Sequence, residues 1–222
     1  MLIYVTAFAL GILHAFGPDH LAAVSTFVSH RRRRLPALGV SLRWGMGHLL
    51  SVLLFGVLVA ALAVHIPERF EAFAEFGAGL VLVLVGLLSL RRSFRARRLH
   101  YHRHRHGTVV HAHLHTHAHS EEHFDGHAAT LTGAVHGLAG AAPALALTPL
   151  AAMNSPWVMG AYLLLFGLGV TLGMAAYCLA LGGVLQRIPQ LTLERWVQPL
   201  IASGSCALGV VWMARTGLLF PM

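Results

Sequence analysis

Long apolar runs recur along the whole chain and constrain its fold more than any other feature. A run of about 18 or more apolar residues is long enough to cross the hydrocarbon core of a bilayer as a helix. Only 11% of the 222 residues are charged, against about 25% in soluble domains. The sequence therefore predicts an all-α, polytopic membrane protein. Its expected partners include the lipid bilayer in which it is embedded. Six transmembrane helices are expected, at about residues 2–28, 38–63, 73–90, 129–150, 157–185 and 196–219.

The arginines set the expected orientation. The chain has no lysine and a net charge of +8. Its arginines gather in the first, third and fifth loops, above all in Arg31–Arg34 and in residues 91–98. Because positive loops stay in the cytoplasm, we expect these loops inside and both termini outside, in a cell membrane of the prokaryotic inner-membrane type. Charge in blocks beside spans does not form a basic face on a folded domain, so no nucleic-acid partner is expected.

A polar interruption, HAFGPDH at residues 14–20, lies within the first apolar run. Proline removes a backbone donor and glycine permits unusual dihedral angles, so Gly17-Pro18 predicts a break in the first helix. On a regular helix His14 and His20 would point to different faces. A break lets His14 end one half-helix while Asp19 and His20 begin the next, so that all three side chains converge on one ion. An ionisable group inside a span indicates a functional site.

Two further histidines, His48 and His136, lie inside apolar runs among small residues. Burying such polar groups without mutual use would cost about 1–3 kcal/mol each. Imidazole together with carboxylate suits divalent transition metals. The span histidines and Asp19 therefore predict a shared metal or proton site. For each histidine alone, a hydrogen-bonded packing role is the competing interpretation.

A short internal match divides the chain into two halves. Gly11–His14 (GILH) resembles Gly133–His136 (GAVH), and each opens a half with three expected spans, residues 1–90 and 129–222. Because three is odd, the halves would be inserted in opposite orientations. Inverted repeats of this type place the substrate site at their interface, on broken helices. Chance is the competing explanation of so short a match.

A long polar segment, residues 91–128, joins the halves and is expected on the cytoplasmic side. Its histidines alternate with other residues, and neutral imidazole is the commonest protein ligand of transition metals. This composition is typical of a flexible metal-binding tract without a fixed fold in the absence of metal. A solvated linker that is merely rich in histidine is the alternative. The accessory metal-binding residues predicted here are His111, His113, His115, His117 and His119.

In its motifs the chain resembles the nickel/cobalt transporter family, and within it the short urease-accessory-type nickel permeases. The matching stretches are His14-Ala15, Pro18–Ser25, Trp44–His48, Val135–Gly140 and Leu165–Met174. The resemblance implies an integral membrane permease that carries Ni²⁺ or Co²⁺ as its substrate and needs no cofactor. By carry-over, the transport ligands are His14, Asp19, His20 and His48, with His136 as a further candidate. Family members often have a second acid where this chain has Gly17, so its site carries less negative charge.

The direction of transport stays open at this level. The likeness to the short permeases favours import, whereas the long histidine-rich loop is similar to efflux members of the broad family. A cytoplasmic metallochaperone is a candidate partner of that loop. Two other classes compete: a metal sensor or accessory subunit without transport of its own, and an intramembrane metalloenzyme. The chain is not expected to be an enzyme, because it has no His-Glu-x-x-His pattern and no obvious general base beyond Asp19.

Overall fold

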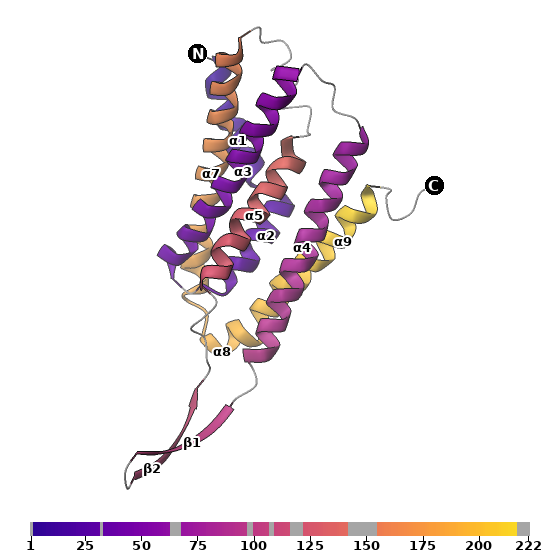
Figure 1. Cartoon of the computed structure of the whole chain (residues 1–222). Coiled ribbons are helices and arrows are strands. Elements are labelled where there is room, and N and C mark those ends of the chain that lie inside the picture. Colours follow the sequence, from indigo (N-terminus) through magenta and orange to yellow (C-terminus); the bar gives the residue numbers. More distant parts are fainter. Residues whose placement is uncertain are drawn as a thin grey trace.

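The fold is a bundle of long helices that stand side by side (Figure 1). The structure is a computed structural model of the chain and describes residues 2–31, 33–62, 68–96, 100–106, 109–115, 122–141 and 155–216. Its helices are α1 (Leu2–Ala15), α2 (Pro18–Ser29), α3 (Arg34–Leu62), α4 (Glu68–Ala96), α5 (Glu122–Ala141), α7 (Pro156–Leu185), α8 (Gln190–Thr192), the π-helical turn η1 (Leu193–Val197) and α9 (Gln198–Arg215).

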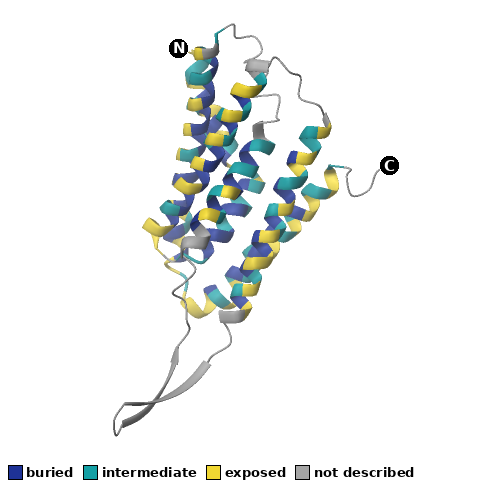
Figure 2. Ribbon diagram, in the orientation of Figure 1, coloured by how far each residue is buried: buried dark blue, intermediate teal, exposed yellow. Residues whose placement is uncertain are grey.

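Apolar helices of membrane-spanning length dominate the described part of the chain. Four stretches are each long and apolar enough to cross a membrane: 34–59, 69–94, 157–185 and 190–215. The bent pair α1 and α2 is a fifth candidate. Large apolar side chains such as Leu54, Leu131 and Leu200 are exposed, as in helices that face lipid. Figure 2 shows exposed residues along the outer faces of the helices. The prediction of a helical, multi-pass membrane protein is confirmed.

The helix boundaries differ from the predicted spans at several ends. α4 continues to Ala96, beyond the predicted end at residue 90, and so includes Arg91 and Arg92. Long arginine side chains can extend toward the membrane surface, so a helix need not end where its apolar run ends. α5 is described only to Ala141, and the rest of the predicted span 129–150 lies outside the described residues.

The predicted break at Gly17-Pro18 is present. α1 ends at Ala15, α2 begins at Pro18, and the two half-helices diverge by 60°. Gly17 has φ −54° and ψ 138°, because a residue before proline is driven out of the helical region. The Gly17 N–H donates to the carbonyl of His14 over 3.0 Å and closes α1. Proline is well placed at the first position of α2, where its missing N–H has no helical partner to lose.

α2 lies at the centre of the bundle and packs against α3, α4, α5, α7 and α9. Around it, α1 packs on α7, α3 packs on α5 and α7, and α4 packs on α9. Glycine allows two of these crossings to be very close. A Cβ atom at Gly11 would overlap the carbonyl oxygen of Phe166, and one at Gly133 would overlap that of Trp44. Small residues at crossings let membrane helices approach backbone to backbone.

An antiparallel hairpin follows α4. Its strands are β1 (His100–His106) and β2 (Val109–His115), paired in a register that sets His104 opposite His111 and His102 opposite His113. The sequence predicted no fixed secondary structure here, and the structure differs in these two stretches. The alternation of histidine with other residues has the two-residue period of a strand. Of the predicted accessory histidines, His117 and His119 lie outside the described residues.

Candidate metal centre

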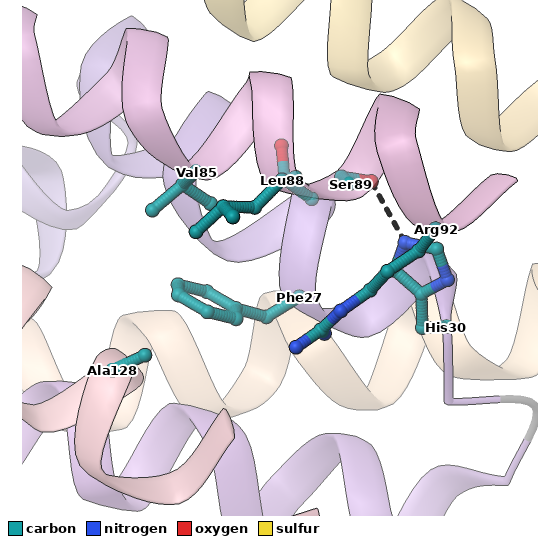
Figure 3. Close-up of a pocket in the computed structure, with 8 residues that line it drawn as sticks. Phe27, His30, Val85, Leu88, Ser89, Arg92 and Ala128 are labelled. Atoms are coloured by element: carbon teal, nitrogen blue, oxygen red, sulfur yellow. Dashed lines mark hydrogen bonds between the residues drawn. The ribbon is translucent and has the colours of Figure 1, made fainter. Parts of the chain in front are cut away.

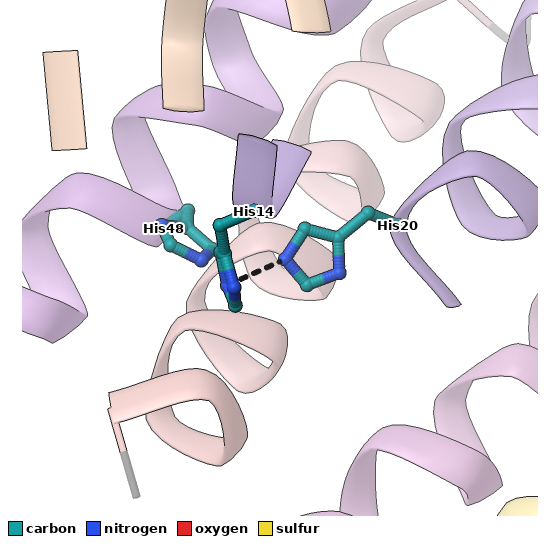
Figure 4. A group of neighbouring side chains, drawn as sticks. All are labelled: His14, His20 and His48. Carbon is teal, nitrogen blue, oxygen red and sulfur yellow. Dashed lines mark hydrogen bonds between the residues drawn. The ribbon is translucent and has the colours of Figure 1, made fainter. Parts of the chain in front are cut away.

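Three imidazoles from three different helices meet inside the bundle (Figure 4). His14 comes from the end of α1, His20 from the start of α2, and His48 from the middle of α3. His20 and His48 are buried, and His14 is half-buried. One ring nitrogen from each lies within 4.8 Å of the other two. Since metal–imidazole bonds are about 2.0–2.1 Å, two such nitrogens on one ion lie about 3–4 Å apart, and a small contraction would let the cluster hold an ion.

The break in the first helix creates the closest pair in this cluster. Nε2 of His14 and Nε2 of His20 are 3.2 Å apart, and the two rings meet edge to face. On an unbroken helix these residues would diverge, so the 60° bend at Gly17-Pro18 brings them together. His48 completes the group, with its ring centroid 5.6 Å from that of His14 and 5.4 Å from that of His20.

Asp19 lies behind His20. Its Oδ2 accepts a hydrogen bond from Nδ1 of His20 over 2.8 Å. This contact uses the ring nitrogen opposite the one that faces His14. A carboxylate in this place fixes the tautomer and the ring orientation of a metal-binding histidine and raises its basicity. With its proton on Nδ1, neutral His20 presents a lone pair at Nε2, so His14 Nε2 is the donor of the hydrogen bond between them.

Gly17 leaves room for this carboxylate. A Cβ atom at position 17 would lie 2.8 Å from Oδ1 of Asp19 and 3.3 Å from the carbonyl oxygen of His14. Any larger side chain would press on Asp19 or displace it. The residue that makes the helix break easy therefore also gives Asp19 its position against His20, and Asp19 is the only acid of the segment 14–20.

His136 borders the same cluster from α5. Its ring is fully buried, with its centroid 5.5 Å from that of His20. Its Nδ1 donates to the carbonyl oxygen of Thr132 over 2.8 Å, so Nε2 keeps a free lone pair. A backbone carbonyl on the second ring nitrogen is the usual support of a metal-binding histidine. The structure thus brings all four span histidines together, with Asp19 attached through His20.

Several buried polar atoms of the cluster have no hydrogen-bond partner among the described residues. They are both ring nitrogens of His48, Nε2 of His136 and Nε1 of Trp44. Leaving a buried polar atom unpaired costs about 1–3 kcal/mol, and the interior of a bilayer supplies no water to relieve the cost. A bound cation would take up the imidazole lone pairs. The unpartnered lone pairs of His48 and His136 are therefore what a site built for an ion leaves when only the protein is considered.

Aromatic walls that sequence reasoning did not single out enclose the cluster. Trp44 stacks on His48 at 5.2 Å between ring centroids, and Phe166 lies 5.3 Å from His14. Trp44 precedes His48 by one helical turn, and Thr132 precedes His136 by one turn. This i, i+4 spacing to an intramembrane histidine was the available signal, since such residues share a helix face.

A separate small cavity lies between α2, α4 and α5, away from the imidazole cluster (Figure 3). Its volume is about 30 Å³, enough for about one or two water molecules. Nε2 of His30 and Oγ of Ser89 are 2.7 Å apart in its wall. The guanidinium of Arg92 disfavours a cation there. The cavity is lined by Thr26, Phe27, His30, Val85, Leu88, Ser89, Arg92 and Ala128.

Known proteins similar to this chain are found among nickel transporters and urease accessory proteins. The urease accessory protein UreH of Bacillus sp. (strain TB-90) is 32% identical over 185 residues, which cover 81% of this chain and 76% of that protein. The high-affinity nickel transport protein of Cupriavidus necator is 32% identical over 106 residues, 41% of this chain and 29% of that protein. No solved structure gives a significant match.

A plant relative shows how widely the sequence pattern is shared. The chloroplast protein FOR GROWTH AND FERTILITY 1 of Arabidopsis thaliana is 29% identical over 214 residues, 93% of this chain and 58% of that protein.

The family described as "NicO: High-affinity nickel-transport protein" matches residues 1–196. That match includes every residue of the imidazole cluster together with α1 to α7. On this coverage the chain belongs to the NicO family.

Proposed function

We propose that this protein carries a divalent transition-metal ion, Ni²⁺ or Co²⁺, across a membrane through the imidazole cluster. The observation that carries the proposal is the convergence of His14, His20 and His48, with unpartnered ring nitrogens, inside an apolar bundle. Polar groups at this depth are costly and mark ion pathways. Family membership indicates which class of ion is carried, because the family description names nickel transport.

The donor set suits this substrate. Neutral imidazole binds nickel, cobalt, copper and zinc, so geometry and availability select among them. His14, His20 and His48 would bind the ion, and His136 offers a fourth nitrogen. Asp19 would offset part of the positive charge through His20. Since α1 and α2 are half-helices joined at residues 16–17, small rotations there would open the site to one side or the other.

We also propose that the chain is built from two inverted repeats of three spans. The support is a set of contacts that recurs at a constant separation of 122 positions. Gly11 abuts the Phe166 carbonyl as Gly133 abuts the Trp44 carbonyl. The partner helix of each crossing shows the same match. Gly169 abuts the Phe8 carbonyl and the Ile12 nitrogen. In the other crossing, Gly47 abuts the Thr130 carbonyl and the Ala134 nitrogen.

The remaining helix contacts fit the same two-fold relation. The crossing of α1 on α7 corresponds to that of α5 on α3, while α3 with α7 and α4 with α9 pair across the axis. Gly79 and Gly209 each abut the other's carbonyl oxygen. In this arrangement α1–α2 and α5 open equivalent halves, each followed by two spans, which gives six. The imidazole cluster lies at the interface of the halves, with His14 and His136 as equivalent residues.

The proposed orientation places the arginine-rich loops and the segment 91–128 in the cytoplasm and both termini outside, in a cell membrane. The start of α1 and the end of α9 lie toward one end of the bundle, and the end of α4 lies toward the other (Figure 1). The histidine-rich hairpin would then hold ions on the cytoplasmic side and pass them to or from a metallochaperone.

Metal-resolved flux in proteoliposomes tests the transport function. Ni²⁺ and Co²⁺ should cross the bilayer with the wild-type protein, and His14→Ala, His20→Ala and His48→Ala should each abolish the flux. His127→Ala is the matched control, because His127 is an exposed histidine at the start of α5. If flux survives all three changes in the cluster, the site assignment is wrong.

An accessory role without transport is the second candidate, favoured by the name of the Bacillus relative. It predicts a protein that binds nickel in detergent but moves none in liposomes. Direction is tested in cells with the gene deleted. Loss of activity of nickel enzymes would indicate import, which the likeness to a urease accessory protein favours. Sensitivity to excess nickel would indicate efflux.

A further inference from the structure

Trp44 lies against several imidazoles of the cluster at once. Its side chain is fully buried. The indole stacks on His48 with an interplanar angle of 27°, and it meets His20 edge to face with centroids 5.0 Å apart. The ring of His136 lies 6.2 Å away. Trp44 thus forms the wall that three of the four imidazoles share.

The indole N–H is the unusual part of this wall. Nε1 of Trp44 is buried and has no hydrogen-bond partner among the residues that the structure describes, although a buried tryptophan normally finds one. Indole nitrogen is a donor only and cannot bind a metal. A bound ion alone would take up lone pairs of His48 and His136 but would offer the N–H of Trp44 no acceptor.

An oxygen atom bound to the ion would supply this acceptor. We propose that the ion occupies the cluster together with one solvent oxygen ligand, water or hydroxide, and that Nε1 of Trp44 donates a hydrogen bond to that oxygen. This inference rests on the proposed function and refines it: the transported species keeps part of its hydration at the site. Three or four imidazoles leave room for such a ligand, as in metal sites with an open position.

The two halves of the chain differ at this point. Phe166 is the residue 122 positions after Trp44, and it lies 5.3 Å from His14 as Trp44 lies 6.2 Å from His136. Phenylalanine covers an imidazole but donates no hydrogen bond. The oxygen ligand is thereby assigned to the side of the cluster that Trp44 and His48 form. Phenylalanine in an equivalent wall also indicates that Trp44→Phe is sterically acceptable.

Co²⁺ binding to the full-length protein in detergent tests the inference. Trp44→Phe keeps an aromatic ring over His48 and removes only the N–H. It should weaken Co²⁺ binding about tenfold, as the loss of an outer hydrogen bond to a metal site does, and should shift the visible ligand-field absorption. Trp157→Phe is the matched control, because Trp157 is 88% exposed, and it should change neither property.

A wild-type measurement keeps the inference testable even if Trp44→Phe does not fold. With Cu²⁺ as the probe and D₂O as solvent, pulsed electron paramagnetic resonance should detect the deuterons of a directly bound water or hydroxide. Their absence would overturn the inference, as would wild-type Co²⁺ affinity and absorption in a folded Trp44→Phe. Failure of the proposed function looks different: Co²⁺ binding would then be unaffected by His48→Ala.

Discussion

At the scale of single residues, the role of Asp19 is set by which atom of His20 it contacts. The family resemblance implies that Asp19 is a metal ligand, and the structure places its Oδ2 against Nδ1 of His20. A carboxylate held there acts through the ring: it fixes the proton on Nδ1, leaves Nε2 free, and makes that nitrogen a better donor to a metal. The negative charge would still lie near an ion held by the cluster and would favour its entry.

This geometry predicts that two substitutions of Asp19 have different effects. Asp19→Ala removes the acceptor and should weaken Ni²⁺ binding about 10- to 100-fold. Asp19→Asn keeps an oxygen that accepts from Nδ1, so its loss should be clearly smaller. Competition with a calibrated chelator measures both affinities. Equal losses in the two variants would show that the charge or direct ligation dominates, and the orienting role would be wrong.

At the scale of elements, the break between α1 and α2 decides whether the cluster exists. The proline at position 18 has no N–H, so the carbonyl of His14 is free to accept from Gly17 and end α1. Pro18→Ala restores a donor four residues after His14, which favours a continuous helix. We expect Ni²⁺ affinity to fall while the helical circular dichroism is kept or increased.

The control for this change is Pro36→Ala, which alters an exposed proline in the first turn of α3, where a missing N–H has little effect. It should bind Ni²⁺ like the wild type. Wild-type affinity in Pro18→Ala would show that packing of α2 against its neighbours, and not the proline, maintains the bend.

Helix crossings supply the second prediction at this scale. A Cβ atom at Gly133 would overlap the backbone of Trp44, and backbone cannot move aside as a side chain can. Gly133→Ala should therefore destabilise the protein by about 1–3 kcal/mol, seen as a lower midpoint of thermal unfolding in detergent. At Gly160, also within a helix, a Cβ atom meets nothing within 4 Å. Gly160→Ala should be neutral or stabilising by about 0.5–1 kcal/mol, and equal effects at the two positions would contradict the close crossing.

Hydropathy and local chain chemistry account for what could be predicted from the sequence. Apolar runs indicated the helices, and Gly17-Pro18 indicated the bend, because both depend on short-range properties. The aromatic wall at Trp44 was not predicted, since an aromatic residue in a span looks the same whether it faces lipid, a neighbour or an ion. The orientation of the His20 ring was not predictable either, because it depends on the angle between two half-helices.

At the scale of the whole molecule, the proposed inverted repeats would form a structural pair with unequal chemistry. His14 and His136 would be equivalent residues, and both are imidazoles. His48, by contrast, corresponds to Val170, which is fully buried on α7 four residues after Phe166. The proposed site would then lie on an approximate two-fold axis, with more imidazole ligands on one side of that axis than on the other. Inverted repeats commonly exchange conformations between their halves during transport, so a ligand position on one half has a counterpart on the other.

The proposed two-fold relation predicts that the His48 ligand can be moved to the other half. His48→Val should abolish Ni²⁺ binding at the cluster, and His48→Val combined with Val170→His should restore a substantial part of it, because the proposed repeat makes the buried position 170 the counterpart of position 48. The matched control combines His48→Val with Val52→His, which places an imidazole at a buried valine one turn further along α3 without a two-fold relation to His48. Ni²⁺ titrations of the three variants decide the matter. Equal recovery with Val52→His would mean that any nearby imidazole suffices, and no recovery in a folded Val170→His variant would show that the halves are not equivalent at the site.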